Sequence, residues 1–379
     1  SGESHGPGLV ATVEGLPSGL TVVSDGISNE LARRRLGFGR GPRMRLEKDE
    51  IEILGGVRFA KTLGGPVSVL IRNTEWPRWQ DEMSSDPAGT ATKVETTPRP
   101  GHADLVGMMK YDTHDARDIL ERASARETAA RTIVGYLSKQ VLREVGVEVF
   151  SHVTAIGSVT VPSDVDLPLP EDLAQIDSSQ VRVLDANVES AMIAEIESAK
   201  ADRDTLGGAV EVLTYGLPAG LGSHVHWDRK LDGLLAGALM SIQAIKAVEI
   251  GDGLTQARSR GSKAHDEIIR TDDSYARRTN RAGGLEGGMT TGGVLRVTAY
   301  MKPIATLMRA LDTVDVTTRQ EAKAFRERSD VCAVPAAGVV AEQMVAYVLA
   351  NEVTRSFGGD TVGDLRTNCD AYRTRLASF

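Results

Sequence analysis

The chain has 379 residues, of which 41% are hydrophobic, 25% are charged and only 4% are aromatic. This composition is ordinary for a soluble globular protein with an aliphatic core, and a formal net charge of -8 argues against a nucleic-acid partner. Two cysteines, Cys332 and Cys369, are too few for a disulfide framework and suit a reducing cytosol. Because we find no apolar run of about 18 residues and no signal peptide, we expect a cytoplasmic protein without a membrane partner, and a few native residues before Ser1.

The first hundred residues predict short strands around one helix. Apolar stretches separated by turn residues predict strands over residues 9–13, 20–23, 50–57 and 66–71. Residues 27–35 have a helical pattern and end in three consecutive arginines. Residues 73–100 are polar and contain prolines, so we expect irregular backbone there and a mobile lid.

Longer elements follow in the rest of the chain. Apolar residues at three- and four-residue steps predict helices over residues 115–145, 228–248 and 336–353. Apolar runs predict strands over residues 147–156, 208–214 and 294–301. The charged stretch 258–280 is a second candidate for a mobile lid.

One sequence pattern occurs twice. Residues 13–20 contain Gly-Leu-Pro-Ser-Gly-Leu and residues 214–221 contain Gly-Leu-Pro-Ala-Gly-Leu, each after an apolar strand and before a helical stretch. The repeat indicates either two halves related by an old duplication or a common turn used twice. Because the order of elements lacks the strict alternation of a parallel doubly wound sheet, we expect an α/β sandwich in a single domain over residues 1–379.

Two histidines lie in glycine-flanked loops. His5 follows Ser1-Gly2-Glu3-Ser4, and His102 lies in Arg99-Pro100-Gly101-His102-Ala103-Asp104. Small neighbours leave an imidazole uncovered, and its titration near neutrality suits proton transfer. The alternative is a turn histidine with a local hydrogen bond. Asp104 either orients the imidazole of His102 or caps the helix that follows.

Clustered arginines suggest an anionic ligand. Arg34 and Arg40 flank the end of a helix that runs into a glycine-rich loop, and guanidinium groups bind phosphate and carboxylate in bidentate fashion. Arg122 and Arg126 are four residues apart and are expected to share a helix face. The small residues 123–125 between them would let a flat ring lie near the backbone. The competing interpretation is an exposed ladder of arginine and glutamate.

Two later stretches complete the pattern. Residues 281–293 contain six glycines, whose backbone N–H groups could line a cofactor or an anion, although a flexible loop is the alternative. Arg328-Ser329-Asp330 precedes a predicted helix and could bind an anion and supply a base, or could simply form a helix cap. The seven histidines form no metal-binding pattern, so we expect no metal.

Taken together, these stretches resemble the chorismate synthase family, in the family's order and spacing, from Gly2 to about Phe357. The segments that carry the resemblance are residues 2–6, 99–104, 122–128, 283–289 and 328–330. The departures are small: Gly55 stands where the family commonly has serine, and Ala247 stands where glycine is common. Neither departure touches a proposed catalytic group.

The resemblance implies a β-α-β-α sandwich, with helices packed between antiparallel sheets, assembled as a homotetramer. It implies a carbon–oxygen lyase of the shikimate pathway of aromatic amino acid biosynthesis. The enzyme would form chorismate by 1,4-anti-elimination of phosphate from 5-enolpyruvylshikimate 3-phosphate, with tightly bound reduced FMN. NADPH on the enzyme or an external flavin reductase would reduce the flavin.

The resemblance also implies roles for individual residues. It places FMN contacts on Arg122, Ala123, Ser124, Gln243, Ala244, Gly287, Lys302, Pro303, Ile304, Ala305, Thr306 and Arg328. It places substrate contacts on Arg34, Arg40, Arg99, Arg126 and also Arg328. We expect Arg34 and Arg40 to hold substrate rather than NADPH.

Three catalytic residues follow from the same resemblance. His102 would protonate or stabilise the leaving phosphate, His5 would balance charge near N1 of the reduced flavin, and Asp330 would relay a proton near N5. Two alternatives stay open. One is a flavoprotein oxidoreductase with net electron transfer to its substrate, and the other is a non-catalytic scaffold that binds an anion or a flavin.

Overall fold

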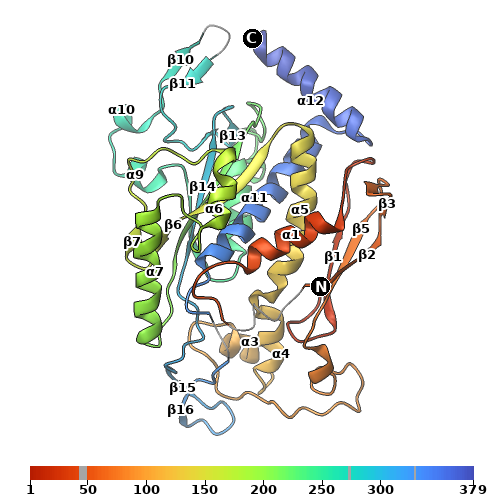
Figure 1. Ribbon diagram of the computed structural model, residues 1–379, viewed down its shortest axis with the longest axis vertical. Coiled ribbons are helices and arrows are strands. Elements are labelled where there is room, and N and C mark those ends of the chain that lie inside the picture. The colour runs from red at the N-terminus through yellow and green to blue at the C-terminus, as the bar shows by residue number, and fades with distance from the viewer. Residues whose placement is uncertain (42–48, 272–274, 328–329) are drawn as a thin grey trace.

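The computed structural model describes residues 1–41, 49–271, 275–327 and 330–379. Within these ranges the chain has a mixed α/β structure with antiparallel sheets and helices. Figure 1 shows the long central helices between the two larger sheets. This arrangement brings segments from both ends of the sequence into the middle of the molecule.

The N-terminal sheet has the antiparallel strand order β1-β5-β2. Its strands are β1 (Gly8–Val13), β2 (Ile51–Gly55) and β5 (Val67–Arg72), and α1 (Ser24–Arg35) follows β1. Side chains alternate along β5, where Val67, Val69 and Ile71 are buried. The strand predicted over residues 20–23 is wrong, because the chain bends into α1 at Ser24 and Thr21 forms only an isolated bridge.

The second sheet is larger and has the order β7-β6-β8-β14-β9. Its strands are β6 (Glu148–Ile156), β7 (Val159–Thr160), β8 (Gly208–Tyr215), β9 (Ile245–Ile250) and β14 (Leu295–Met301). The strands predicted over residues 147–156, 208–214 and 294–301 are confirmed within one residue at each end. These runs are easily recognised because most of their side chains are buried.

Two long helices form the centre of the molecule, α5 (Thr128–Glu144) and α11 (Val334–Phe357), and the shorter α8 (Leu231–Met240) packs against α11. α5 and α11 pack against each other, while α5 contacts β1 and α11 contacts β6 and β8. By length and composition α11 could cross a membrane, with a mean hydropathy of 1.2 over 18 residues. However, 83% of that window is buried inside the molecule, as expected for a core helix.

The helix predicted over residues 115–145 is interrupted near its middle. The chain forms α4 (Arg117–Ala123), a 3-10 turn η2 (Ala125–Glu127) and then α5. Ser124 is extended, with ψ of 140°, and its side chain caps the turn by accepting from the backbone N–H of Arg126 at 3.2 Å. Arg122 and Arg126 therefore do not share a helix face, contrary to the sequence prediction.

The helix predicted over residues 228–248 is also wrong in its second half. α8 ends at Met240, and residues 245–250 form β9, which pairs with β14. Between the two elements Ala244 has a φ of +66°, a left-handed conformation that stops a helix. The apolar spacing of this stretch suits either structure, and pairing with β14 decides for the strand.

The repeated turns make the same hydrogen bonds. Thr62 Oγ1 donates to the carbonyl of Pro17 at 2.6 Å and accepts from the N–H of Leu20 at 2.9 Å. In the second turn Thr290 makes the equivalent pair of contacts, to the carbonyl of Pro218 at 2.7 Å and from the N–H of Leu221 at 2.9 Å. The repeated sequence pattern therefore forms the same local structure at both places.

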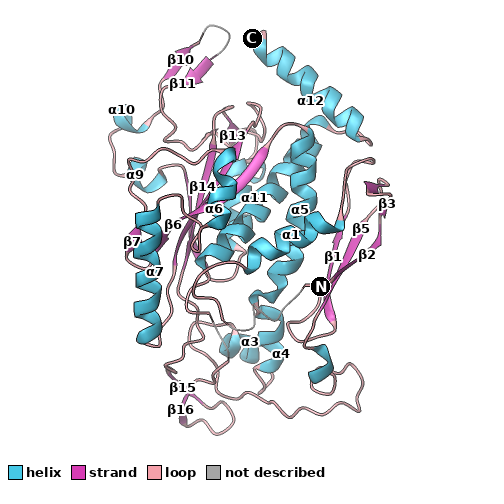
Figure 2. Cartoon of the chain, viewed as in Figure 1, coloured by secondary structure: helices cyan, strands magenta, loops and turns pink. Residues whose placement is uncertain are grey.

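The remaining elements lie around this framework. They are β3 (Val57–Arg58), β4 (Lys61–Thr62), η1 (Trp76–Arg78), α3 (Asp104–Tyr111), η3 (Pro170–Asp172), α6 (Leu173–Ser178), α7 (Ala186–Ala201), η4 (Trp227–Arg229), α9 (Gly253–Ala257), α10 (Gly261–Ala264), β10 (Ile268–Arg270), β11 (Tyr275–Arg277), β12 (Leu285–Glu286), β13 (Met289–Thr290), β15 (Asp312–Val314), β16 (Glu321–Lys323) and α12 (Val362–Ala377). Figure 2 shows the chain between β5 and α3 almost wholly as loop, as predicted for residues 73–100. That this segment and residues 258–280 act as lids stays a prediction.

Candidate active site

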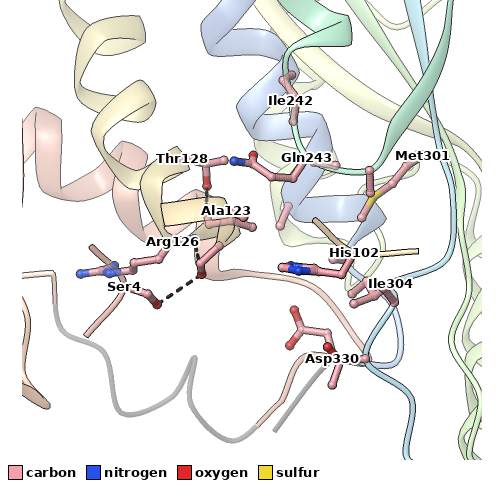
Figure 3. A pocket seen from close by; sticks show the side chains of 18 of the residues that line it. Ser4, His102, Ala123, Arg126, Thr128, Ile242, Gln243, Met301, Ile304 and Asp330 are labelled. Atoms are coloured by element: carbon pink, nitrogen blue, oxygen red, sulfur yellow. Dashed lines mark hydrogen bonds between the residues drawn. The ribbon is translucent and has the colours of Figure 1, made fainter. Parts of the chain in front are cut away.

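A cavity of about 420 Å³ opens where α4, η2 and α5 meet the N-terminus of α11. The loops around residues 242–244 and 301–306 and the N-terminal loop complete its wall. Figure 3 shows Ser4 and Arg126 on one side of this space and His102, Ile304 and Asp330 on the other. Segments that are more than three hundred residues apart in sequence therefore share one cavity.

The cavity collects most of the residues singled out in the sequence. Its lining includes His5, Arg34, Arg40, Arg99, His102, Ala123, Ser124, Arg126, Gln243, Ala244, Lys302, Ile304, Ala305, Thr306 and Asp330. Both glycine-flanked histidines are in this set, and so are the four proposed substrate arginines that the structure describes. The loops around His5 and His102 thus face the same space.

Three of the predicted cofactor contacts that the structure describes are not in the lining. Arg122 instead donates from Nη1 to the carbonyl of Gly2 at 2.6 Å, because the extended Ser124 turns it away from Arg126. Gly287 lies in the turn between β12 and β13, and Pro303 is missing from an otherwise continuous lining run. Arg328 lies outside the described residues.

His5 is buried and held by a carboxylate from α4. Its Nδ1 lies 2.7 Å from Glu121 Oε1, and its backbone N–H donates to Glu121 Oε2 at 2.8 Å. Burial by itself would raise the pKa of Glu121, but hydrogen bonds from His5 and Arg117 outweigh it and lower that pKa. Because an ionised carboxylate only accepts hydrogen bonds, Nδ1 of His5 carries a proton.

His102 is held in the same way by its near neighbour Asp104. The Nδ1 of His102 donates to Asp104 Oδ1, and Arg99 Nε donates to Asp104 Oδ2 at 2.8 Å. The N-cap of α3 is Ala103, so Asp104 orients the imidazole rather than capping the helix. Arg99 Nη2 also lies 3.1 Å from Nδ1 and 3.4 Å from Nε2 of His102, so a ligand that binds Nε2 would lie beside this guanidinium group.

The pairing of Asp104 predicts an acid-sensitive contribution to stability. Burial would raise the pKa of Asp104, but hydrogen bonds from His102 and Arg99 lower it from 3.8 to about 2. Since the pKa is lower in the folded state, this contribution is complete at neutral pH and is lost as the pH falls from about 4 to about 2. We expect it to be worth roughly 2 kcal/mol.

Urea denaturation of the Asp104→Asn variant at pH 4 and pH 2 tests this expectation. The variant should lose less unfolding free energy over this interval than the wild type does. The exposed Asp86→Asn variant serves as control and should retain the wild-type dependence. An equal loss in wild type and Asp104→Asn would contradict the assignment.

A second cluster of charge lies on the opposite side of the cavity. Arg126 Nη1 donates to Asp49 Oδ1 at 2.5 Å, and Arg34 Nη2 lies 3.7 Å from Asp49 Oδ2. Burial would raise the pKa of Asp49, but Arg126 and Arg34 lower it, so the carboxylate stays ionised. Asn73 Oδ1 accepts from Arg126 at 3.0 and 3.2 Å. The arginines are thus held in place before any ligand arrives.

Arg40 and Asp330 form a third group of charged side chains in the cavity wall. Arg40 Nη1 lies 3.3 Å from Asp330 Oδ2, and the N–H of Gly41 donates to Asp330 Oδ1 at 2.6 Å. Asp330 therefore connects the segment before α11 with the loop after α1. The N-cap of α11 is Ala333, so Asp330 is not the helix cap that the sequence allowed.

One wall of the cavity offers small residues and an unused acceptor. Ala123, Ala336 and Ala337 are among its apolar lining residues. Gln243 Nε2 donates to Glu127 Oε1 at 2.7 Å, whereas its Oε1 is buried and has no hydrogen-bond partner among the described residues. Such an oxygen suits a ligand that carries an N–H group.

Several important residues were missed by the sequence analysis. They are Asp49, Asn73, Trp79, Glu121 and Glu127. Glu121 and Glu127 lie within or next to a motif that was noticed, but Asp49, Asn73 and Trp79 stand in stretches with no recognisable pattern. Among the described residues, no group of three His, Cys, Asp or Glu side chains could hold a metal ion.

Comparisons with known proteins identify the family of this chain. A family model described as chorismate synthase matches residues 1–354. A chorismate synthase from Thermobifida fusca is 59% identical over 99% of this chain and 98% of its own length, and one from Streptomyces coelicolor is 57% identical over 99% and 97%. A crystal structure of chorismate synthase, 38% identical, superposes with a TM-score of 0.80 and covers 100% of this chain and 97% of its own. The chain therefore belongs to the chorismate synthase family.

Proposed function

We propose that this chain catalyses the elimination of phosphate from 5-enolpyruvylshikimate 3-phosphate to give chorismate, with bound reduced FMN. The observation that carries the proposal is the single cavity lined by His5, His102 and four arginines. The reaction breaks the C3–O bond to phosphate and removes a proton from C6, without net oxidation or reduction. This makes the enzyme a carbon–oxygen lyase of the shikimate pathway.

The cavity residues fit a flavin. The volume of the cavity, about 420 Å³, lies within the usual range for small-molecule and cofactor sites. Small side chains at Ala123, Ala336 and Ala337 leave room for a flat ring, and the buried Oε1 of Gln243 suits a ring N–H. When bound, reduced FMN would supply electron density to the substrate as the phosphate leaves. Ser124, Ala244, Lys302, Ile304, Ala305 and Thr306 would hold it.

The arginines would bind the anionic groups of the substrate. Arg34, Arg40 and Arg126 line the cavity and present guanidinium groups, which form strong charge-assisted hydrogen bonds with phosphate and carboxylate. Arg99 lies beside His102, where it would share the phosphate. Holding several anionic groups at once fixes the substrate in one orientation, which lowers the entropic part of the barrier.

His102 would act on the leaving group. Because Asp104 fixes the proton on Nδ1, a protonated ring presents Nε2–H to a phosphate oxygen. His5 would place a second imidazole near the reduced ring and balance its charge. Asp330, linked to Arg40, would relay the proton that leaves the substrate.

Replacing Arg40 by alanine should chiefly weaken substrate binding. A charge-assisted hydrogen bond contributes about 1.5–3 kcal/mol, so we expect KM to rise by roughly 10- to 100-fold with a smaller change in kcat. Steady-state kinetics at saturating flavin measure both constants. Arg375→Ala, which removes an exposed arginine of α12 outside the cavity, is the control. An unchanged KM in Arg40→Ala would remove this residue from the binding site.

Anaerobic incubation of the protein with reduced FMN and 5-enolpyruvylshikimate 3-phosphate tests the proposed function directly. Chorismate should appear by absorbance together with an equal amount of phosphate. The alternative, a flavoprotein oxidoreductase, predicts NADPH consumption in proportion to product. A binding scaffold predicts neither product. NADPH added with oxidised FMN, with and without a flavin reductase, identifies the source of electrons.

The family resemblance also supports a proposed location, assembly and architecture. We infer a cytoplasmic homotetramer, which sedimentation analysis would test. We also infer a single domain with a β-α-β-α sandwich that arose by duplication. The duplication is supported by the matching hydrogen bonds of Thr62 and Thr290, and by the matching sheet orders β1-β5-β2 and β8-β14-β9.

A further inference from the structure

The imidazole of His5 is fixed on two sides. Glu121 contacts its Nδ1 edge, and the ring of Trp79 stacks on its face with centroids 3.9 Å apart and an interplanar angle of 23°. Only 8% of His5 is exposed, although it lines the cavity. The Nε2 of His5 has no hydrogen bond to any described residue, so it is the atom left to act on a ligand.

Glu121 is itself oriented by several donors. Its Oε1 accepts from His5 Nδ1 and lies 3.3 Å from Arg117 Nη1, while its Oε2 accepts from the backbone N–H of His5. Every one of these contacts needs an acceptor at Glu121. An amide in its place would turn an N–H group toward one of them. Glu121 thus couples the position of the His5 loop to the tautomer of the His5 ring.

Trp79 comes from the irregular segment 73–100 and is itself supported. Lys93, which lies later in the same segment, places its Nζ 3.4 Å from the centroid of the Trp79 ring. At the start of the same segment Asn73 Nδ2 donates to the carbonyl of Gly6 at 2.8 Å. The segment therefore fastens the backbone of the His5 loop at Asn73 and covers its side chain at Trp79.

We propose that Glu121 and Trp79 are positioning residues for His5: Glu121 keeps the proton on Nδ1, and Trp79 fixes the ring plane so that Nε2 faces the cavity. This inference rests on the proposed function, because it assigns the use of His5 to that reaction. Neither residue needs to touch substrate or cofactor. A carboxylate that holds the tautomer of a catalytic imidazole is a recurring device in enzymes.

The Glu121→Gln variant tests the first part. Its amide should shift the proton of His5 from Nδ1 toward Nε2, and kcat should fall by about 10²-fold, the lower range for a positioned proton-transfer group, with KM nearly unchanged. Nitrogen-15 spectra of histidine-labelled protein report the tautomer, and His5→Asn assigns the signal. Glu95→Gln is the matched control, because Glu95 also pairs with Arg117, at 3.6 Å, but does not contact His5.

Fluorescence tests the second part. A stacked imidazole quenches indole emission, so His5→Asn should raise the emission of Trp79. The increase should persist in a Trp76→Phe background and disappear in a Trp79→Phe background. Trp79→Ala, which uncovers the ring, should lower kcat, whereas Trp79→Phe, which keeps an aromatic face, should restore most of it.

The outcomes separate this inference from the proposed function. A His5 proton on Nε2 in the wild type, or an unchanged tautomer and kcat in Glu121→Gln, would overturn the role of Glu121. An emission increase that survives Trp79→Phe would overturn the stack. The spectra need no substrate, so a tautomer shift in a protein that makes no chorismate would contradict the proposed function and leave the positioning intact.

Discussion

His102→Ala is expected to lower kcat by about two to four orders of magnitude, the usual contribution of a positioned proton donor, while flavin affinity changes little. The ring lines the cavity, and its Nδ1 is committed to Asp104, so Nε2 is the atom available to the leaving phosphate. Chorismate formation with reduced FMN measures the rate, and flavin titration measures the affinity.

Two further variants make the result specific. His114→Ala removes an exposed histidine that does not line the cavity and should keep wild-type turnover. Asp104→Asn keeps the imidazole but replaces one of the two carboxylate acceptors, which serve His102 and Arg99, by an N–H donor, so its kcat should lie between those of wild type and His102→Ala. Wild-type turnover in His102→Ala would remove this histidine from the mechanism.

The sequence predicted the secondary structure well where an element is buried along its whole length. Strands β6, β8 and β14 are rich in apolar residues and mostly buried, and the structure has them within one residue of the prediction at each end. The failures occur where a hydrogen bond that the apolar spacing does not reveal, either tertiary or local, decides the structure. Residues 245–250 fit a helical spacing, but pairing with β14 makes them a strand, and the cap at Ser124 divides an otherwise helical pattern.

In the site, too, the residues with a local sequence pattern were recognised and those without one were missed. His5, His102 and the arginines were recognised because glycines or arginine clusters surround them in sequence. Asp104, two residues from His102, was also recognised, but the distant partners were not, since Asp49 and Asn73 meet Arg126 only after folding. A single buried carboxylate or amide in an irregular segment has no local pattern, because its partner lies far away in the chain.

Glu342→Ala is expected to destabilise the fold by about 3–5 kcal/mol, because it removes one member of a buried ion-pair network. Glu342 has no exposed surface and lies in the middle of α11. It accepts from Arg33 Nη1 at 2.7 Å and from Lys139, and Ser151 Oγ donates to it at 3.0 Å. Without Glu342, Arg33 and the buried cations Lys139 and Arg182 would lose a shared counter-charge.

The lowered pKa of Glu342 shows that its carboxyl group is ionised in the folded protein. Burial alone would raise the pKa of Glu342, but Arg33 and Lys139 hold it far below its ordinary range. Because the folded-state pKa is lower than the unfolded one, the ion pair stabilises the fold across neutral and mildly acidic pH, and the contribution is lost only in strong acid. Denaturation at pH 7 therefore measures the network fully charged.

A double-mutant cycle separates the ion pair from the loss of packing. Glu342→Gln and Lys139→Met should each destabilise the protein, and the double variant should lose less than the sum, because it leaves fewer buried charges unpaired. Asp312→Ala is the surface control: its partner Lys323 is exposed, so its effect should stay below about 1 kcal/mol. Additive losses in the cycle would show that Glu342 and Lys139 do not stabilise each other. In that case Arg33, which is adjacent in α1 to the cavity residue Arg34, would be the partner that matters.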